Sequence, residues 1–162
     1  MLVNPATRGN TFTLPKAKNG AFEDVLEFAV QNKKDMTERE WFWHMLVPAD
    51  LHPHIEFTDP TSPCQRNEVT LNGEVWHHYF GASRRADIIF PKRLLRLNHR
   101  LKVSIPPEGL ESYRIYYYFV TEFGYWPRRA GRMELFTMGA GTDSPAVLSS
   151  KYFAQLVVNK SK

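Results

Sequence analysis

The dipeptide Asn72-Gly73 constrains the fold of this chain most, because it lies between two segments suited to β-strands. Residues 69–71 (Val-Thr-Leu) precede it and residues 74–76 (Glu-Val-Trp) follow it. Asn-Gly readily supplies the two positive-φ positions of a tight turn, and it is the strongest short signal for a β-hairpin. The sequence therefore predicts antiparallel strands on either side of this turn.

Several other segments have the composition of strands, with apolar, β-branched or aromatic residues bounded by turn-forming residues. The turn at Pro106-Pro107-Glu108-Gly109 separates two of them. The predicted strands cover residues 11–14, 86–90, 100–105, 113–121, 132–137 and 152–158.

Three segments instead predict helices. From Gly20 onward, apolar residues recur at intervals of three and four. Thr37 and Glu40 form a capping box at the start of a second segment, which ends before Pro48. Pro91 suits the first position of a third, short helix. The apolar faces of these helices consist of Phe22, Val25, Leu26, Ala29 and Val30, then Trp41, Phe42, Met45 and Leu46, then Leu94, Leu95 and Leu97.

These elements predict an α+β fold in which N-terminal helices precede a mostly antiparallel β-sheet or pseudobarrel with a short inserted helix. At 162 residues the chain is expected to form a single domain. Residues 1–65 hold six basic and nine acidic residues and carry −3, whereas residues 66–162 hold fifteen and eight and carry +7. We therefore expect an acidic, helix-rich flank beside a basic, β-rich part.

The strongest concentration of charge lies between Arg84 and Lys102, where seven basic residues and one acid give +6. The same segment is apolar enough to fold, so its cations are expected on packed structure and not on a tail. Cations on a folded surface suit a polyanion, and nucleic acid is the first partner to consider.

Composition excludes some other classes of protein. No apolar run approaches the roughly 20 residues of a membrane helix, and the first residues do not read as a secretory signal. Cys64 is the only cysteine, which excludes an intramolecular disulfide and favours a reducing, cytoplasmic location with an inert thiol.

A second basic loop is predicted at residues 122–132, and it also contains two aromatic residues, Tyr125 and Trp126. These rings could stack on bases or enter a groove, or they could close the open end of the sheet. Among the cations of residues 84–100 and 122–132, arginine outnumbers lysine eight to one, and the planar arginine fork suits guanine and phosphate. These cations are Arg84, Arg85, Lys92, Arg93, Arg96, Arg100, Arg128, Arg129 and Arg132.

The basic half resembles the DNA-binding pseudobarrel of plant B-three-type transcription factor domains and of the effector domain of EcoRII-type restriction endonucleases. Phe90-Pro91-Lys92 stands where that family has an apolar strand ending in Ile-Pro-Lys or Ile-Pro-Ser. The resemblance covers residues 66–162. It implies two loops that grip the major groove, an N-arm at residues 81–87 and a C-arm at residues 122–132.

We therefore predict a sequence-specific, double-stranded DNA-binding domain, which could be the recognition module of a restriction-modification or other DNA-processing system. No catalytic residue, metal, cofactor or membrane partner is expected. The predicted nucleic-acid-binding residues are Arg84, Arg85, Lys92, Arg93, Tyr125, Trp126, Arg128, Arg129 and Arg132.

Two other functions stay open at the level of sequence. His52, His54 and Glu56 could hold a divalent metal in a nicking or phosphodiester-cleaving enzyme. His-hydrophobic-His nicking enzymes use such a pair, but here Pro53 takes the central position. Alternatively, the basic face could dock on an acidic protein, as in an inhibitor or another protein-interaction module.

Overall fold

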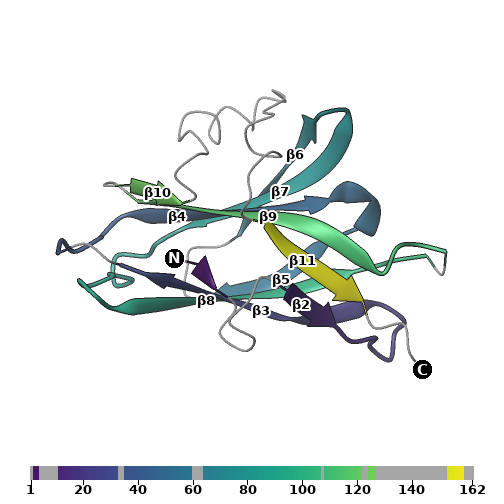
Figure 1. Cartoon of the computed structure of the whole chain (residues 1–162), viewed down its shortest axis with the longest axis horizontal. Coiled ribbons are helices and arrows are strands. Elements are labelled where there is room, and N and C mark those ends of the chain that lie inside the picture. Colours follow the sequence, from purple (N-terminus) through teal and green to yellow (C-terminus); the bar gives the residue numbers. More distant parts are fainter. Residues whose placement is uncertain are drawn as a thin grey trace.

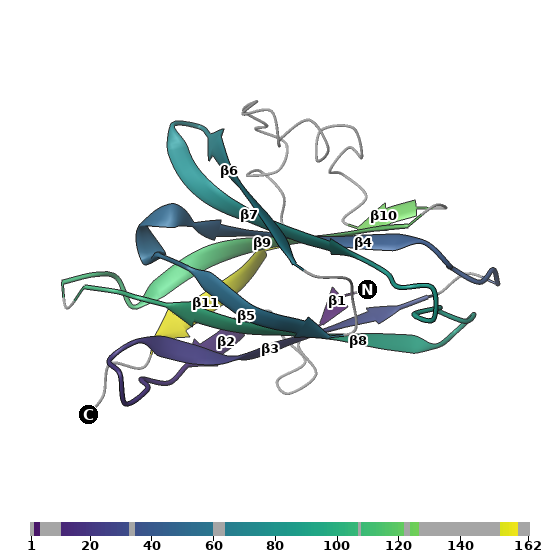
Figure 2. The same cartoon turned by 180° about the vertical axis from the view of Figure 1, so that it is seen from behind.

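Two β-sheets pack face to face in the computed structural model, as Figures 1 and 2 show from opposite sides. The structure describes residues 2–3, 11–32, 35–59, 64–106, 108–121, 124–126 and 153–158. Within these residues the longest helix is a single 3-10 turn, η1 (Ala49–Leu51). The predicted α+β class is therefore wrong, and the described part of the chain is nearly all β.

The smaller sheet, sheet A, has four strands in the order β1-β3-β8-β5. All neighbouring strands in it are antiparallel, and β5 contains a bulge between Ile55 and Phe57. Its strands are β1 (Leu2–Val3), β3 (Phe22–Gln31), β8 (Leu94–Val103) and β5 (His54–Asp59).

The larger sheet, sheet B, has the strand order β2-β11-β9-β4-β7-β6, and β10 pairs with β9. Only β11 and β2 pair in parallel, and these two strands bend toward β3 of the other layer in Figure 1. Its strands are β2 (Thr11–Leu14), β11 (Phe153–Val158), β9 (Ser112–Thr121), β10 (Gly124–Trp126), β4 (Trp41–Pro48), β7 (Glu74–Ala82) and β6 (Gln65–Leu71).

The core lies between the two sheets and is rich in aromatic rings. Phe28 of sheet A stacks on Tyr117 of sheet B, with ring centroids 3.9 Å apart. His99 is completely buried beside them, and its Nε2 lies 2.8 Å from the Tyr117 hydroxyl. The centroid of the Trp43 ring lies 4.3 Å from that of the His99 ring. Burial of these rings removes a large apolar area from water and stabilises the contact between the sheets.

Several predicted strands are confirmed. The Asn72-Gly73 hairpin joins β6 to β7, and the φ angles of 50° and 78° are those of a type I′ turn. The segments predicted as strands at 11–14, 113–121 and 152–158 correspond to β2, β9 and β11. The strand predicted at 100–105 is the second half of the longer β8.

The first predicted helix is wrong, because residues 22–31 form strand β3. The pattern of Phe22, Leu26 and Val30 fits both a helical face and alternate positions of a strand. Phe28 distinguishes the two, since it is 3 % exposed in the core although the helical pattern omits it. Val25, which that pattern would bury, is 36 % exposed.

The second predicted helix is also wrong, since its segment forms β4. Trp41, Trp43, Met45 and Val47 face the core, and His44 and Leu46 on the opposite face are buried as well. A strand covered on both faces shows no alternation, so its apolar run fits a helix equally well. Glu38 of the expected capping box instead forms an isolated bridge with Ile89.

The third predicted helix, after Pro91, is strand β8, in which burial alternates from Leu95 to Val103. The strand predicted at residues 86–90 is wrong too, because only Ile89 pairs there, in the bridge to Glu38. The strand predicted at residues 132–137 lies outside the described residues.

Both sheets contain strands from the two halves of the sequence. In sheet A, β8 lies between β3 and β5, and in sheet B, β4 lies between β7 and β9. The acidic half is therefore not a helical flank beside the basic half. No helix in the described residues is long and apolar enough to cross a membrane.

Candidate nucleic-acid interface

Two loops meet at one end of the sandwich, on the left in Figure 1. One loop connects β3 to β4 and the other connects β7 to β8. The first contributes Asn32 and residues 35–40, and the second contributes residues 83–93; we call these residues together the arginine end. Both loops are described except for residues 33 and 34.

Asn32, buried at 6 % exposure, joins the two loops. Its side-chain amide donates hydrogen bonds to the carbonyl oxygens of Met36 (2.7 Å) and Ile89 (3.2 Å). Its backbone amide donates to the Arg93 carbonyl at 3.1 Å, and its own carbonyl accepts from the Lys92 amide at 2.8 Å. These bonds hold the two loops in one arrangement.

The β7–β8 loop is also fixed to the core of the sandwich. Trp41 is fully buried, and its indole Nε1 donates to the Asp87 carbonyl at 2.6 Å. Ile89 is 2 % exposed and belongs to the core, and its backbone pairs with that of Glu38. The arginines of this loop are therefore carried on an anchored backbone, as a recognition surface requires.

Arg84, the first predicted DNA-binding residue, is paired within its own loop. Its Nε lies 3.0 Å and its Nη2 3.3 Å from the two carboxylate oxygens of Asp87. The Arg84 backbone amide donates to the same carboxylate at 2.9 Å. Burial opposes the charged carboxylate, but these Arg84 contacts prevail and lower the pKa of Asp87. The Arg84 fork therefore shapes a turn, and its Nε–Nη2 edge can engage an external anion only by leaving Asp87.

The remaining cations of this end are more accessible. Lys92 is exposed and forms an ion pair with exposed Asp35, with a separation of 2.9 Å. Arg39, Arg85 and Arg93 are exposed and make no ion pair with any described residue. The structure thus places the predicted residues Arg85, Lys92 and Arg93 on one loop of the arginine end, and it places Arg39, which the sequence interpretation did not select, on the other loop.

The other cations of the +6 segment lie elsewhere, on the outward face of sheet A. Arg96 pairs with Glu27 of β3 at 3.0 Å, and Arg100 pairs with Glu56 of β5 at 2.9 Å. Lys102 lies opposite Glu23 in the register of β3 and β8. This face carries charges of both signs beside one another, so it does not present a continuous basic surface.

The second predicted basic loop is described only in part. Tyr125 and Trp126 belong to β10, whose backbone pairs with Val120 and Phe119 of β9. Thr121, the last residue of β9, pairs with Trp41, so this backbone lies at the same end of sheet B as the β7–β8 loop. The predicted binding residues Arg128, Arg129 and Arg132 lie outside the described residues.

The described residues show no cluster of ligands that would support the alternative metal site. His52 follows η1 with a φ of 46°, His54 begins β5, and Glu56 is ion-paired with Arg100. Across the part of the chain that the structure describes, no three His, Cys, Asp or Glu side chains are grouped so as to hold a metal ion.

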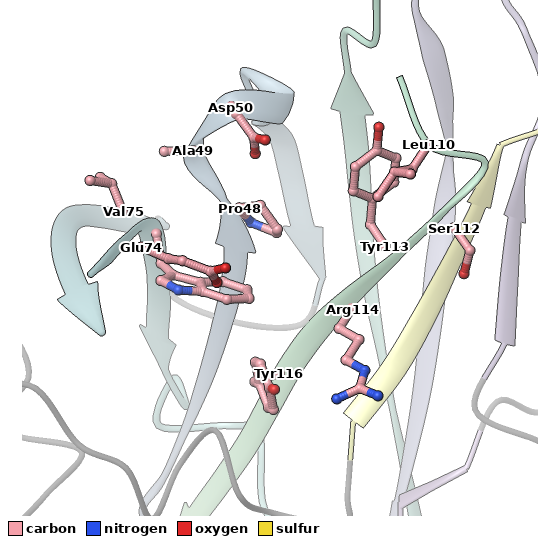
Figure 3. Close-up of a pocket in the computed structure, with 11 residues that line it drawn as sticks. Pro48, Ala49, Asp50, Glu74, Val75, Leu110, Ser112, Tyr113, Arg114 and Tyr116 are labelled. Carbon is pink, nitrogen blue, oxygen red and sulfur yellow. The ribbon is translucent and has the colours of Figure 1, made fainter. Parts of the chain in front are cut away.

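A groove of about 730 Å³ opens at the other end of the sandwich, beside η1 and the β6–β7 hairpin (Figure 3). Trp76 and Tyr116 line it and contact each other edge to face, with centroids 5.4 Å apart. Asp50, Glu74 and Arg114 bring charges of both signs to its walls. The sequence interpretation did not predict this groove, because its residues come from three segments distant in the chain.

A pair of buried histidines on the outward face of sheet B also escaped the sequence interpretation. His44 Nδ1 and His78 Nε2 are 2.9 Å apart, and the rings stack at 5.1 Å. Burial lowers the pKa of His44 to about 3 and that of His78 to about 4. Both rings are thus neutral near pH 7, and the pair is a packing element at that pH. Cys64 is equally unreactive, since burial raises the pKa of its thiol to about 11.

Comparisons with protein-family models, with curated proteins and with solved structures gave no match to this chain. The resemblance of residues 66–162 to the DNA-binding pseudobarrel stays a prediction that rests on the motif at Phe90-Pro91-Lys92.

Proposed function

We propose that this protein binds nucleic acid through the arginine end, with double-stranded DNA as its ligand. The observation that carries the proposal is the group of three exposed arginines, Arg39, Arg85 and Arg93, which lack ion pairs among the described residues. An ion-paired guanidinium must first lose its partner, whereas these three can engage phosphate or guanine directly.

The position of these arginines supports a grip on a rigid polyanion. They come from two loops that Asn32 holds together, so the backbone that carries them is ordered before the ligand binds. Side chains on an ordered backbone lose less conformational entropy on binding than the same side chains on a flexible tail. Lys92 adds a fourth cation, although Asp35 competes for it.

The proposal places sequence-specific contacts on the arginine forks and non-specific contacts on Lys92. A cytoplasmic location fits this function and the single, unreactive thiol of Cys64. No catalytic step is part of the proposal.

The test is a titration of a labelled random duplex, followed by fluorescence anisotropy, at several salt concentrations. Neutralising about four phosphates would give a slope of log K against log salt near −3.6. The double variant Arg85→Ala/Arg93→Ala removes two contacts and should reduce the magnitude of that slope by about 1.8.

The matched control is Arg96→Ala/Arg100→Ala, which removes the same charge from the outward face of sheet A. If this control weakens binding as much as the loop variant, attraction is a property of net charge alone and the arginine end is not the site. Absence of duplex binding by the natural sequence at about 50 mM salt would reject the function itself.

A further inference from the structure

A tight turn projects from the arginine end at residues 90–93. The Arg93 amide donates to the Phe90 carbonyl at 3.1 Å, which closes a four-residue β-turn. Pro91 fixes a negative φ at the second position, and Lys92 has a φ of 60° at the third. This combination defines a type II turn, whose third position favours glycine. The chain places a charged residue at this strained position.

The side chain of Phe90 is exposed to solvent, although the residue before it belongs to the core. Phe90 is 58 % exposed, whereas Ile89 is 2 % exposed. Asn32 binds the Ile89 carbonyl on one side of Phe90 and the Lys92 amide on the other. The backbone thus holds this ring out of the core and in solvent.

Two more apolar side chains are exposed next to this turn. Met36 is 49 % exposed, and its carbonyl accepts from the same Asn32 amide that binds Ile89. Leu94, the first residue of β8, directly follows the turn and is 50 % exposed. Exposed apolar side chains on the same two joined loops as exposed arginines are typical of a binding surface and unusual for plain solvent-facing structure.

We propose that Phe90 is an apolar wedge that enters between base pairs of duplex DNA when the surrounding arginines bind the backbone. This inference rests on the proposed function and adds how the ligand is deformed. Proteins that bend DNA use Phe, Leu, Ile, Met or Pro in this way and grip the flanking phosphates with cations. Phe90 with Met36 and Leu94 supplies the apolar part, and Arg85, Lys92 and Arg93 supply the cations.

Duplex DNA fits this surface better than the two other ligands that aromatic and basic residues suggest. Readers of single strands present several aromatic rings for successive bases. In the described part of the arginine end, Phe90 is the only aromatic residue with an exposed ring. A lipid surface attracts lysine and arginine alike as point charges, whereas the cations without an ion pair among the described residues of this end are arginines, whose planar forks match phosphates bidentately.

A wedge also predicts which duplexes bind best. Separating a base step costs least at the flexible pyrimidine–purine steps TA and CA/TG. The protein should therefore prefer duplexes with such a step at the centre of the site, and it should bend them there.

The experiment measures bending by energy transfer between dyes at the two ends of a duplex with a central TA step. The natural sequence should raise the transfer on binding. Phe90→Ala should abolish this rise and weaken binding by about tenfold, while the salt slope stays unchanged because the arginines remain. Phe90→Leu retains an apolar wedge and should still bend the duplex.

Two control variants alter exposed apolar side chains away from the turn. Phe57→Ala removes a ring that is 45 % exposed on β5, and Leu110→Ala removes a side chain that is 68 % exposed at the groove end. Both variants should bind and bend DNA as the natural sequence does. Because the three changed side chains lie at the surface, urea unfolding should show that all four variants are folded.

Each result separates the wedge from the proposed function. If the natural sequence binds no duplex, the proposed function fails, and the wedge fails with it. If the natural sequence binds and Phe90→Ala bends the duplex equally, only the wedge is overturned. If a single strand binds more tightly than the duplex, a base-stacking role of Phe90 replaces the wedge. If phosphatidylserine vesicles bind the protein more tightly than the duplex does, and Phe90→Ala abolishes vesicle binding, a lipid-inserting role of Phe90 replaces the wedge.

Discussion

The indole ring of Trp43 lies directly against the backbone of Gly81, its partner in the pairing of β4 with β7. A Cβ atom on Gly81 would come within 2.5 Å of the Trp43 Nε1. Trp43 is fully buried and contacts the ring of His99, so the indole has little room to move away. A single methyl group added at Gly81 should therefore disturb the core.

We expect Gly81→Ala to lower the free energy of unfolding by about 2–3 kcal/mol, because overpacking of a dense core forces side chains from their preferred rotamers. Gly73→Ala is the control, since nothing lies within 4 Å of the added methyl group there. That variant carries only the strain of a φ of 78° and should cost about 1 kcal/mol. Urea unfolding measures both, and equal losses would contradict the close packing of Trp43 on Gly81.

Phe28 and Val25 report whether residues 22–31 form a strand. As a strand, this segment buries Phe28 against Tyr117 and exposes Val25. We expect Phe28→Ala to cost about 3–5 kcal/mol and Val25→Ala less than about 1 kcal/mol. Thermal or urea unfolding checks this, and the reverse order of losses would instead support the helix that the apolar spacing predicts.

His99 should make the protein less stable in acid. Burial lowers its pKa from 6.5 to about 3, so in the folded protein the ring stays neutral while in the unfolded chain it binds a proton. The unfolded state therefore binds more protons between these two values, and the free energy of unfolding falls as the pH decreases from 6.5 toward 3. Above 6.5 this residue adds no pH dependence.

The variant His99→Gln isolates this effect from that of His44 and His78, whose pKa values are also lowered. Gln can still bind the Tyr117 hydroxyl, but it does not titrate. Between about pH 7 and about pH 4.5 the natural sequence should lose on the order of 2 kcal/mol more than the variant. Urea unfolding at the two pH values measures this difference, and an equal loss in both proteins would show that His99 is accessible to protons.

Lys92 allows backbone strain to be separated from charge. Lys92→Gly removes both the side chain and the strain of its positive φ, and we expect it to raise the free energy of unfolding by about 0.5–1 kcal/mol. Lys92→Ala removes the charge but keeps a Cβ in the strained position, so it should not stabilise the protein. Unfolding measurements should rank glycine above alanine, whereas equal stability would contradict the type II turn.

The same two variants also bear on the proposed function. Both lack the Lys92 ammonium, so both should bind duplex DNA more weakly and by similar factors. Anisotropy titrations compare them with the natural sequence. If the glycine variant were more stable and also bound as tightly, the charge at this position would have no part in binding.

The local sequence was sufficient to predict the strands that are bounded by distinctive turns. Asn72-Gly73 sets the φ angles that a hairpin needs, so β6 and β7 could be predicted without knowledge of the rest of the chain. Residues 112–121 are long and aromatic, and β9 matches the strand predicted there almost residue for residue. In both cases the information lies within the segment itself.

The three expected helices show where local information ends. The apolar residues of β3 fit both periodicities, and β4 is buried on both faces, so neither segment distinguishes a strand from a helix. What excludes helices is the pairing of β3 with β8 and of β4 with β7 and β9. These partners lie far away in the sequence, and such contacts override local propensity.

The arrangement of charges was likewise determined partly by the sequence and partly by the tertiary structure. The sequence alone determined that seven cations and one acid lie between Arg84 and Lys102, on a segment apolar enough to fold. Only the tertiary structure decided that Arg96 and Arg100 meet acids on neighbouring strands, that Arg84 is held by Asp87, and that Arg85 and Arg93 make no ion pair with a described residue. The physical reason is that an ion pair depends on separations of a few ångströms, and strand register sets those separations between residues that are distant along the chain.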